Sequence, residues 1–276
     1  MTQHVYLPPR VLSIAGTDPT GGAGIQADLK SIAAHRGYGM AVVSALVAQN
    51  TCGVRSVHVP PASFLAAQLE SVSDDVDIDA VKIGMLADTD MVHTVAAWIN
   101  DVAPPVIVLD PVIVSTSGDR LLSADAEDAL KGLIPTVDLI TPNVPELAVL
   151  AAAPLANSWV ELLDQGREVA NRYQVAVLVK GGHLPGNTVF DCVIDPVSAF
   201  DPVVFESPRI VTRNTHGTGC SLSAAMATLR PQRSGWVSAL EEAKAWLTTS
   251  IRCAEGLRVG RGHGPVNHFA QLWGVA

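Results

Sequence analysis

Residues 214–220 read NTHGTGC, and a helical repeat of apolar side chains begins directly behind this stretch. Leu222, Ala225 and Leu229 are spaced three or four residues apart, which predicts a helix that begins at or near Cys220. Two glycines there let the backbone turn tightly and point N–H groups at an anion. The helix dipole adds to that attraction and favours the thiolate form of a cysteine. The stretch therefore predicts an anion cradle beside an activated nucleophile or base, although a plain Gly-rich turn with a small buried cysteine has the same pattern.

The composition is typical of a well-buried globular protein. Hydrophobic residues make up 48% of the 276 residues and charged residues only 16%, which favours a substantial core over disorder. The formal net charge is −9 and no run of Lys or Arg interrupts it, so we expect no nucleic-acid surface. Residues 1–10 contain two prolines and no apolar core, and no apolar run approaches a membrane span. We therefore expect no secretory signal and no membrane partner.

The number and spacing of the cysteines indicate whether the protein belongs to a reducing or an oxidising cellular compartment. There are four of them, scattered along the chain: Cys52, Cys192, Cys220 and Cys253. They match neither a zinc-site spacing nor a disulfide scaffold, so we expect a protein of the reducing cytoplasm.

Short apolar runs alternate with amphipathic segments from one end of the chain to the other. Predicted strands cover residues 11–15, 40–47, 54–59, 80–83, 106–109, 139–140 and 175–179. Predicted helices cover residues 23–35, 63–72, 90–99, 124–133, 146–150 and 160–173, with a hairpin over 188–195 and 199–206 and two further helices over 217–229 and 237–257. Buried strands between helices imply an α/β protein with a mostly parallel sheet covered on both faces. No linker, composition shift or repeat marks a boundary, so residues 1–276 are predicted to form a single domain.

Potential ligand-binding groups follow six of the predicted strands. In sheets of this class, ligands bind beyond the carboxyl ends of the strands. The groups at these ends are Gly16 with Thr17 and Asp18, Gln49 with Asn50, Gly84 with Met85, Asp110, Asn143 with Glu146, and Lys180 with two glycines. Their succession along one rim favours a site there over a chance distribution.

Individual side chains on this rim suit phosphoryl chemistry. Asp110 and Glu146 could hold Mg²⁺ directly or through water, although either alone is more often a cap or turn residue. Lys180 could reach nucleotide phosphates, and Asp28, inside the first helix, could accept hydrogen bonds from a substrate hydroxyl or amino group. The phosphate loop of the common nucleotide triphosphatases and the signature motifs of protein kinases are both absent, which excludes those two architectures.

An ordered set of motifs covers nearly the whole chain. It consists of residues 14–28, 48–51, 82–86, 110–112, 141–146, 180–183, 214–220 and 262–268. In this order the motifs closely resemble the bacterial hydroxymethylpyrimidine/phosphomethylpyrimidine kinases of thiamine biosynthesis. The departures are small: Thr17 and Thr20 replace serines that are more usual there, and Ser221 stands where threonine is common.

The resemblance implies a ribokinase-like three-layer sandwich with a mostly parallel sheet and no separate lid domain. It implies ATP and Mg²⁺ as cofactors, phosphorylation of 4-amino-5-hydroxymethyl-2-methylpyrimidine to its monophosphate and then its diphosphate, and a homodimer. Carried onto this sequence, the family's roles give a pyrimidine pocket of Gly16, Asp28, Gln49, Met85 and Val112, with Mg²⁺ organised by Asp110 and Glu146. Asn143 and Lys180 would face the ATP phosphates, Gly217, Thr218 and Gly219 would form the anion hole, and Cys220 would be the catalytic base.

The sequence leaves two alternatives to a pyrimidine kinase open. A pyridoxal or pyridoxine kinase would use a similar pocket for a hydroxymethyl pyridine. A catalytically silent ligand-binding protein could keep the same fold, but the intact set of Asp110, Glu146, Lys180, Gly217, Gly219 and Cys220 speaks against it.

Overall fold

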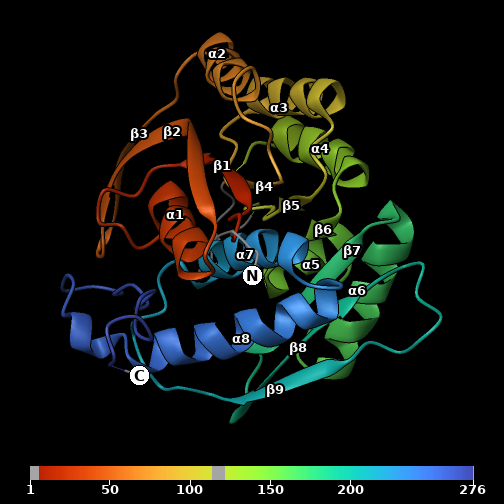
Figure 1. The fold of residues 1–276 in the computed structure, drawn as a ribbon. Coiled ribbons are helices and arrows are strands. Elements are labelled where there is room, and N and C mark those ends of the chain that lie inside the picture. The colour runs from red at the N-terminus through yellow and green to blue at the C-terminus, as the bar shows by residue number, and fades with distance from the viewer. Residues whose placement is uncertain (1–5, 114–121, 276) are drawn as a thin grey trace, which may run out of the picture.

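A single mixed sheet organises the part of the chain that the computed structural model describes, residues 6–113 and 122–275. Its nine strands have the spatial order β3-β2-β1-β4-β5-β6-β7-β8-β9 (Figure 1). The strands are β1 (Arg10–Gly16), β2 (Tyr38–Asn50), β3 (Gly53–His58), β4 (Ala80–Ile83), β5 (Ile107–Leu109), β6 (Leu139–Ile140), β7 (Ala176–Lys180), β8 (Thr188–Ile194) and β9 (Val204–Pro208). The run from β2 to β7 is parallel, whereas β3 at one edge and β8 and β9 at the other pair antiparallel. The carboxyl ends of the parallel strands therefore meet along one rim.

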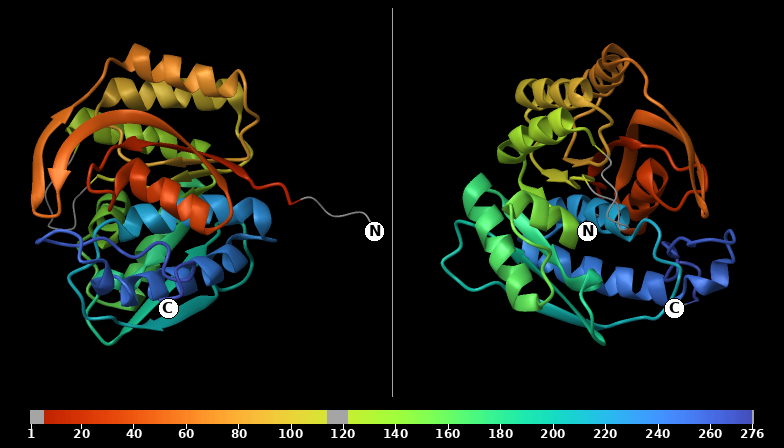
Figure 2. Two further views of the ribbon diagram at one scale, coloured as in Figure 1. Left: turned by 60° about the vertical axis from the view of Figure 1, so that its left-hand side comes forward. Right: turned by 180° about the vertical axis from the view of Figure 1, so that it is seen from behind.

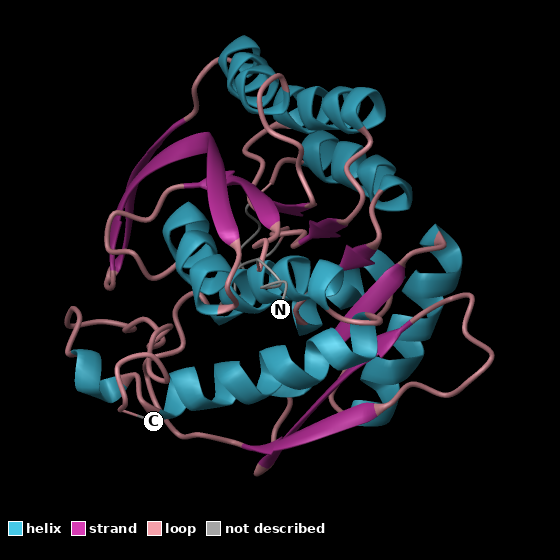
Figure 3. Cartoon of the chain, in the orientation of Figure 1, coloured by secondary structure: helices cyan, strands magenta, loops and turns pink. Residues whose placement is uncertain are grey.

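Helices cover both faces of this sheet, which gives three layers (Figures 2 and 3). The helices are α1 (Gly24–Ala34), α2 (Ala62–Ser73), α3 (Thr89–Val102), α4 (Ala124–Leu133), α5 (Val144–Ala151), α6 (Trp159–Tyr173), α7 (Thr218–Leu229) and α8 (Trp236–Arg252). Helices α2 to α6 share one hydrophobic core with the sheet, and α1, α7 and α8 share a second core on the opposite face. This is the three-layer α/β sandwich with a mostly parallel sheet that the sequence predicts.

The alternation of side chains along the short strands explains the two cores. In β4, Val81 and Ile83 point into the core beneath α2 to α6, while Ala80 points into the core beneath α1, α7 and α8. Lys82 alternates with Val81 and Ile83, so it also faces α1 and α7, and it is fully buried there. Lys82 is therefore a charged side chain at a buried position of β4, where an apolar side chain is usual.

The structure corrects three of the predicted boundaries. Strand β2 continues to Asn50 because it pairs with β3, so Gln49 lies within the strand and not after it. Strand β9 begins at Val204 and not at residue 199, since Pro202 cannot donate to a ladder of hydrogen bonds. Helix α8 ends at Arg252, and only a short 3₁₀ turn covers Glu255–Leu257. Among the described residues, every helix is too short or too polar to cross a bilayer.

Candidate active site

The glycine-rich turn before α7 has the geometry that the sequence predicts. Gly217 caps the helix with a φ of 77°, and a Cβ at this position would lie 1.8 Å from the carbonyl oxygen of Gly22. Only glycine fits this turn. Cys220 is the third residue of α7, in the first turn, whose N–H groups have no acceptor within the helix. The turn can therefore present backbone N–H groups to an anion next to a thiol.

Two predicted phosphate-site and metal-site residues lie against this turn. A Cβ built at Gly219 would lie 3.7 Å from Asp110 Oδ2 and 3.9 Å from Lys180 Nζ. Asp110 follows β5 and Lys180 ends β7, so three separate elements converge on the N-terminus of α7. Thr141 donates a hydrogen bond of 3.2 Å to Asp110 Oδ1, and the other carboxylate oxygen lies nearer the turn. A carboxylate, an ammonium group and backbone N–H groups thus surround one small space.

The environment of Cys220 differs from the sequence-based expectation. The side chain is half-buried, and burial raises the pKa of the Cys220 thiol to about 11. The positive charge of Lys82 lowers this pKa, while the negative charges of Asp28 and Asp110 raise it. The helix N-terminus was expected to bring the thiol towards neutrality. Burial and two nearby carboxylates oppose that effect, so the thiol is mostly protonated at neutral pH.

Asp28 is buried and hydrogen-bonded to two side chains of the sheet. Its side chain is 0% exposed, and Oδ2 accepts hydrogen bonds from Lys82 Nζ at 2.8 Å and from Ser13 Oγ at 2.7 Å. The pair with Lys82 holds one oxygen of this carboxylate in the interior, and a direct contact of Asp28 with the substrate stays a prediction. Oδ1 has no hydrogen-bond partner among the described residues. Lys82 was missed as a site residue, although a lysine in the middle of a four-residue buried strand is a recognisable signal.

Asn143 and Glu146 form a capping box at the start of α5. Asn143 Oδ1 accepts from the Glu146 N–H at 2.8 Å, and Glu146 Oε2 accepts from the Asn143 N–H at 2.8 Å. Glu146 Oε1 also accepts from the N–H of Ile113 at 3.1 Å. Glu146 therefore anchors the segment after β5, in which Val112 has a φ of 38°. A positive φ is strained for a β-branched residue, and such strain is concentrated at functional sites.

The carboxylates at this rim can be compared with what a magnesium ion needs. The described residues contain no group of three or more His, Cys, Asp and Glu side chains arranged to hold a metal. Mg²⁺ does not require one, because it is usually bound by one or two carboxylates together with phosphate oxygens and water. Asp110, 5% exposed and directed at the anion-binding turn, fits this pattern. Glu146 already accepts two backbone N–H groups, so it fits a role through water better than direct coordination.

The predicted pyrimidine pocket lies at the ends of β1, β2 and β4. Met85 Cε would be 2.8 Å from a Cβ at Gly16, so the two residues are in contact only because position 16 is a glycine. Ser44 Oγ donates to the carbonyl of Met85 at 2.6 Å, which joins β2 to the end of β4. Gln49 is half-buried near the end of β2. A hollow of about 610 Å³ lies between Thr17, Pro19 and the hairpin of β2 and β3, and none of the five residues predicted for the pyrimidine pocket lines it.

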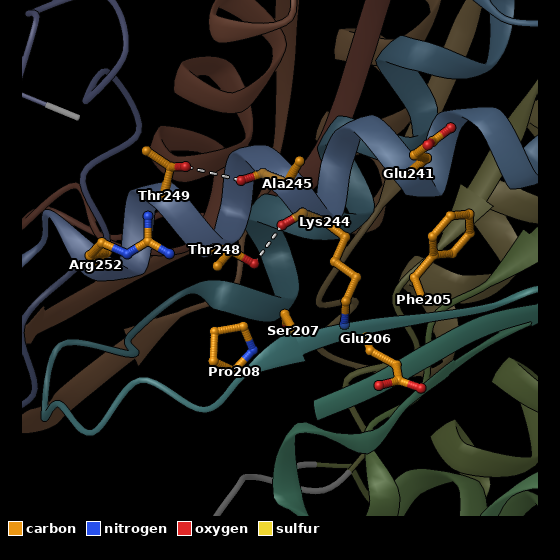
Figure 4. A pocket seen from close by; sticks show the side chains of 10 residues that line it. All are labelled: Phe205, Glu206, Ser207, Pro208, Glu241, Lys244, Ala245, Thr248, Thr249 and Arg252. Atoms are coloured by element: carbon orange, nitrogen blue, oxygen red, sulfur yellow. Dashed lines mark hydrogen bonds between the residues drawn. The ribbon is translucent and has the colours of Figure 1, made fainter. Parts of the chain in front are cut away.

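A second cavity, of about 280 Å³, lies between β9 and α8 (Figure 4). It contains none of the predicted site residues. Lys244 extends from α8 towards β9 and pairs with Asp191, whose other oxygen accepts the N–H of Gly181 at 3.1 Å. This ion pair therefore supports the turn that directly follows Lys180.

The fold and this arrangement define a phosphotransferase of the ribokinase-like class. The family model described as phosphomethylpyrimidine kinase matches residues 18–267. The chain belongs to the phosphomethylpyrimidine kinase family.

Individual relatives agree with this assignment. The hydroxymethylpyrimidine/phosphomethylpyrimidine kinase of Escherichia coli is 50% identical over 263 residues, which cover 95% of this chain and 98% of that protein. A thiamine biosynthesis multifunctional protein of Corynebacterium efficiens is 53% identical over 95% of this chain, which spans only 35% of that longer protein. This chain thus corresponds to about a third of that multifunctional relative.

Solved structures give the same fold. Bacillus subtilis pyridoxal kinase, determined as an ADP complex, superposes with a TM-score of 0.87 at 29% identity, covering 96% of this chain and 99% of that one. Phosphomethylpyrimidine kinase from Clostridium difficile superposes with a TM-score of 0.76 at 32% identity, covering 88% of this chain and 99% of that one.

Proposed function

We propose that this protein uses MgATP to phosphorylate 4-amino-5-hydroxymethyl-2-methylpyrimidine and then phosphorylates the monophosphate to the diphosphate. The observation that carries the proposal is the convergence of Asp110, Lys180 and Cys220 on the N-terminal turn of α7. Its relatives at about 50% identity are named as kinases of this substrate pair.

A pyridoxal kinase is the second candidate, because one such enzyme has the higher TM-score of the two structures described above. The higher sequence identity lies with the pyrimidine kinases, at 50% against 29%. An assay of ADP release with the hydroxymethylpyrimidine and with pyridoxal side by side separates the two candidates. Faster turnover of pyridoxal would reverse the assignment, and binding of the pyrimidine without ADP release would favour a silent binding protein.

In the proposed mechanism, the thiolate of Cys220 accepts the proton of the substrate hydroxyl as that oxygen attacks the γ-phosphorus of ATP. The bond from the γ-phosphorus to the β,γ-bridging oxygen breaks, and ADP leaves. The N–H groups of residues 217–219 stabilise the charge on the transferring group, which is where preorganised donors contribute most. Lys180 neutralises phosphate charge and Asp110 would hold Mg²⁺, whose positive charge screens the phosphates. The contact between Gly16 and Met85 would receive the apolar face of the pyrimidine ring, and Val112 is the third apolar residue that we assign to this pocket.

The proposed role of Asp110 and Glu146 in organising Mg²⁺ can be tested by removing both charges. We expect the double variant Asp110→Asn and Glu146→Gln to stay folded, because glutamine keeps the oxygen that closes the capping box and loses only the bond from the Ile113 N–H. Its midpoint for Mg²⁺ in the ADP-release assay should rise, since both charges at the rim are removed. Glu161→Gln is a matched control, because Glu161 caps α6 from an exposed position, with its N–H bonded to Ser158. An unchanged Mg²⁺ midpoint in the double variant would contradict the assigned role.

Gln49 provides a second test. An amide side chain can donate and accept together, which suits the ring nitrogen and amino edge of an aminopyrimidine. We expect Gln49→Ala to raise the KM for the pyrimidine while kcat and the KM for ATP change little. One lost neutral hydrogen bond corresponds to about 0.5–1.5 kcal/mol, and steady-state kinetics with each substrate varied in turn would measure it. A selective loss of ATP affinity would instead assign Gln49 to the nucleotide site.

The setting of the enzyme is part of the proposal. All four cysteines are unpaired, which supports a reducing compartment such as the cytoplasm. One continuous sheet supports a single domain over the whole chain.

The hairpin of β2 and β3 supports a homodimer, because it carries three exposed apolar side chains, Leu46, Val54 and Val57. Light scattering of the purified protein would measure the assembly, and a monomer at micromolar concentration would contradict it.

A further inference from the structure

Asp18 has an unusual concentration of hydrogen-bond donors for a residue without an assigned role. Its side chain is 0% exposed. Oδ1 accepts from the N–H and the hydroxyl of Thr20 at 2.9 and 2.7 Å, and Oδ2 accepts from the N–H groups of Gly22 and Ala23 at 3.0 and 2.8 Å. A fifth donor, His216 Nε2, lies 2.8 Å from Oδ2. Burial alone would raise the pKa of Asp18, but these hydrogen bonds, with His216 foremost, keep it well below its usual range.

The bond from His216 joins two segments that are far apart in the sequence. Asp18 and His216 are separated by 198 residues. Since an ionised carboxylate only accepts hydrogen bonds, Nε2 of His216 carries the hydrogen. Asp18 fixes the glycine-rich turn of residues 20–23, while His216 directly precedes Gly217, the cap of α7. The hydrogen bond therefore ties the glycine-rich turn to the anion-binding turn.

The two turns are in backbone contact at the same place. The position of a Cβ at Gly217 lies 1.8 Å from the carbonyl oxygen of Gly22, and that of a Cβ at Gly22 lies 2.6 Å from Cδ2 of His216. The His216 N–H also donates to the carbonyl of Gly264 at 3.1 Å. His216 is thus held from two sides, and the backbone N–H groups that follow it have little freedom to move.

We propose that His216 is a positioning residue, which acts through its hydrogen bond to Asp18 to hold the N–H groups of residues 217–219 in the geometry required by the transferring phosphoryl group. The inference rests on the proposed function, because it assigns those N–H groups to the transition state. A displaced anion hole affects the reacting group more than the resting substrates. His216 should therefore affect kcat, and it should affect both phosphorylations because both use the same turn.

The test compares three replacements of His216. We expect His216→Ala to lower the single-turnover rates of both phosphorylation steps by about 10²-fold, the size of effect that a small misplacement of catalytic groups produces. The Kd for MgADP and the KM for the pyrimidine should change little, whereas inhibition by ADP with aluminium fluoride, a mimic of the transferring group, should weaken in parallel with kcat. His216→Gln should recover most of the rate because its Nε2 can take the place of the imidazole Nε2. His216→Asn carries the same amide on a shorter side chain that does not reach Asp18, so it should not recover the rate.

Controls separate this idea from a structural role and from the proposed function. His93 is exposed on α3, and His93→Ala should behave as wild type. Amide hydrogen exchange of residues 217–219 needs no substrate, and it should accelerate in His216→Asn relative to His216→Gln. If the alanine variant does not fold, the glutamine and asparagine variants still decide the question. Equal rates and equal exchange in those two variants would overturn the proposal, whereas absence of turnover in the wild type would overturn the proposed function instead.

Discussion

Replacing Cys220 by alanine is expected to lower the rate of the first phosphorylation by about 10²–10⁴-fold, the usual contribution of a general base. The substrate hydroxyl is a poor nucleophile until its proton is removed, and Cys220 lies in the first turn of α7, which we propose receives the phosphoryl group. Substrate affinity should change little because the thiol is not needed to hold the ring. Single-turnover rates and equilibrium binding of the pyrimidine, measured on the same preparation, separate the two effects.

The pH dependence of the first step provides a second test of the same role. The base must be the thiolate, and burial sets the pKa of the Cys220 thiol at about 11 in the unliganded protein. Below this pKa the thiolate fraction increases about tenfold for each pH unit, so the rate of the first step should rise with pH through the neutral range. Cys52→Ala, which removes an exposed thiol, should leave the profile unchanged. A wild-type rate in Cys220→Ala would eliminate the assigned role.

The second phosphorylation should respond differently to the same substitution. Its acceptor is a phosphate monoester with a second pKa of about 6, so near neutral pH it is already mostly dianionic and needs no base. It does need positioning and charge neutralisation. We therefore expect Cys220→Ser to impair the first step more than the second, and Lys180→Ala to impair both. Equal losses in both steps for Cys220→Ser would mean that the cysteine shapes the phosphate cradle and does not act as a base.

Much of this fold could be predicted because its signals are local. Strand β1 and helix α7 follow from the spacing of apolar side chains, and Gly217 follows from the tight turn that precedes a helix. The order of strand ends predicted that Asp110 and Lys180 lie on the same rim of the sheet, and the structure places both of them near Gly219. The boundary of β2 was less predictable, because its last residues are extended only by pairing with β3.

The features that sequence reasoning missed depend on partners far away in the chain. Nothing near Asp28 indicates that Lys82, 54 residues later, will neutralise it, so its burial could not be inferred from a helical pattern that also fits a solvated face. The raised pKa of the Cys220 thiol was not predicted for a similar reason. The local helix N-terminus is visible in the sequence, whereas the burial of the thiol and the nearby charges of Asp28 and Asp110 are not. Local patterns indicated which residues to group at the rim, and tertiary contacts determine the charges around them.

The buried pair of Lys82 and Asp28 leads to the second large effect. Both side chains are 0% exposed, so Lys82→Met would leave an uncompensated carboxylate in the core and should reduce the free energy of unfolding by about 3–5 kcal/mol. Adding Asp28→Asn should recover part of this loss, because the orphaned charge is then removed. Urea denaturation would measure both variants. Arg167→Met is a matched control, since Arg167 pairs with Asp164 and Asp201 on the surface and such pairs contribute little.

The same variants test whether the pair also tunes the catalytic thiol. Lys82 lowers the pKa of Cys220 and Asp28 raises it, so Lys82→Met should move the pH profile of the first phosphorylation to higher pH and Asp28→Asn should move it to lower pH. The alkylation rate of Cys220, followed by mass spectrometry across the pH range, reports the same shifts without any turnover. A loss of packing alone would move both profiles in the same direction or not at all. Opposite shifts therefore require the two buried charges to act on the thiol, and shifts of equal sign would restrict the pair to a role in stability.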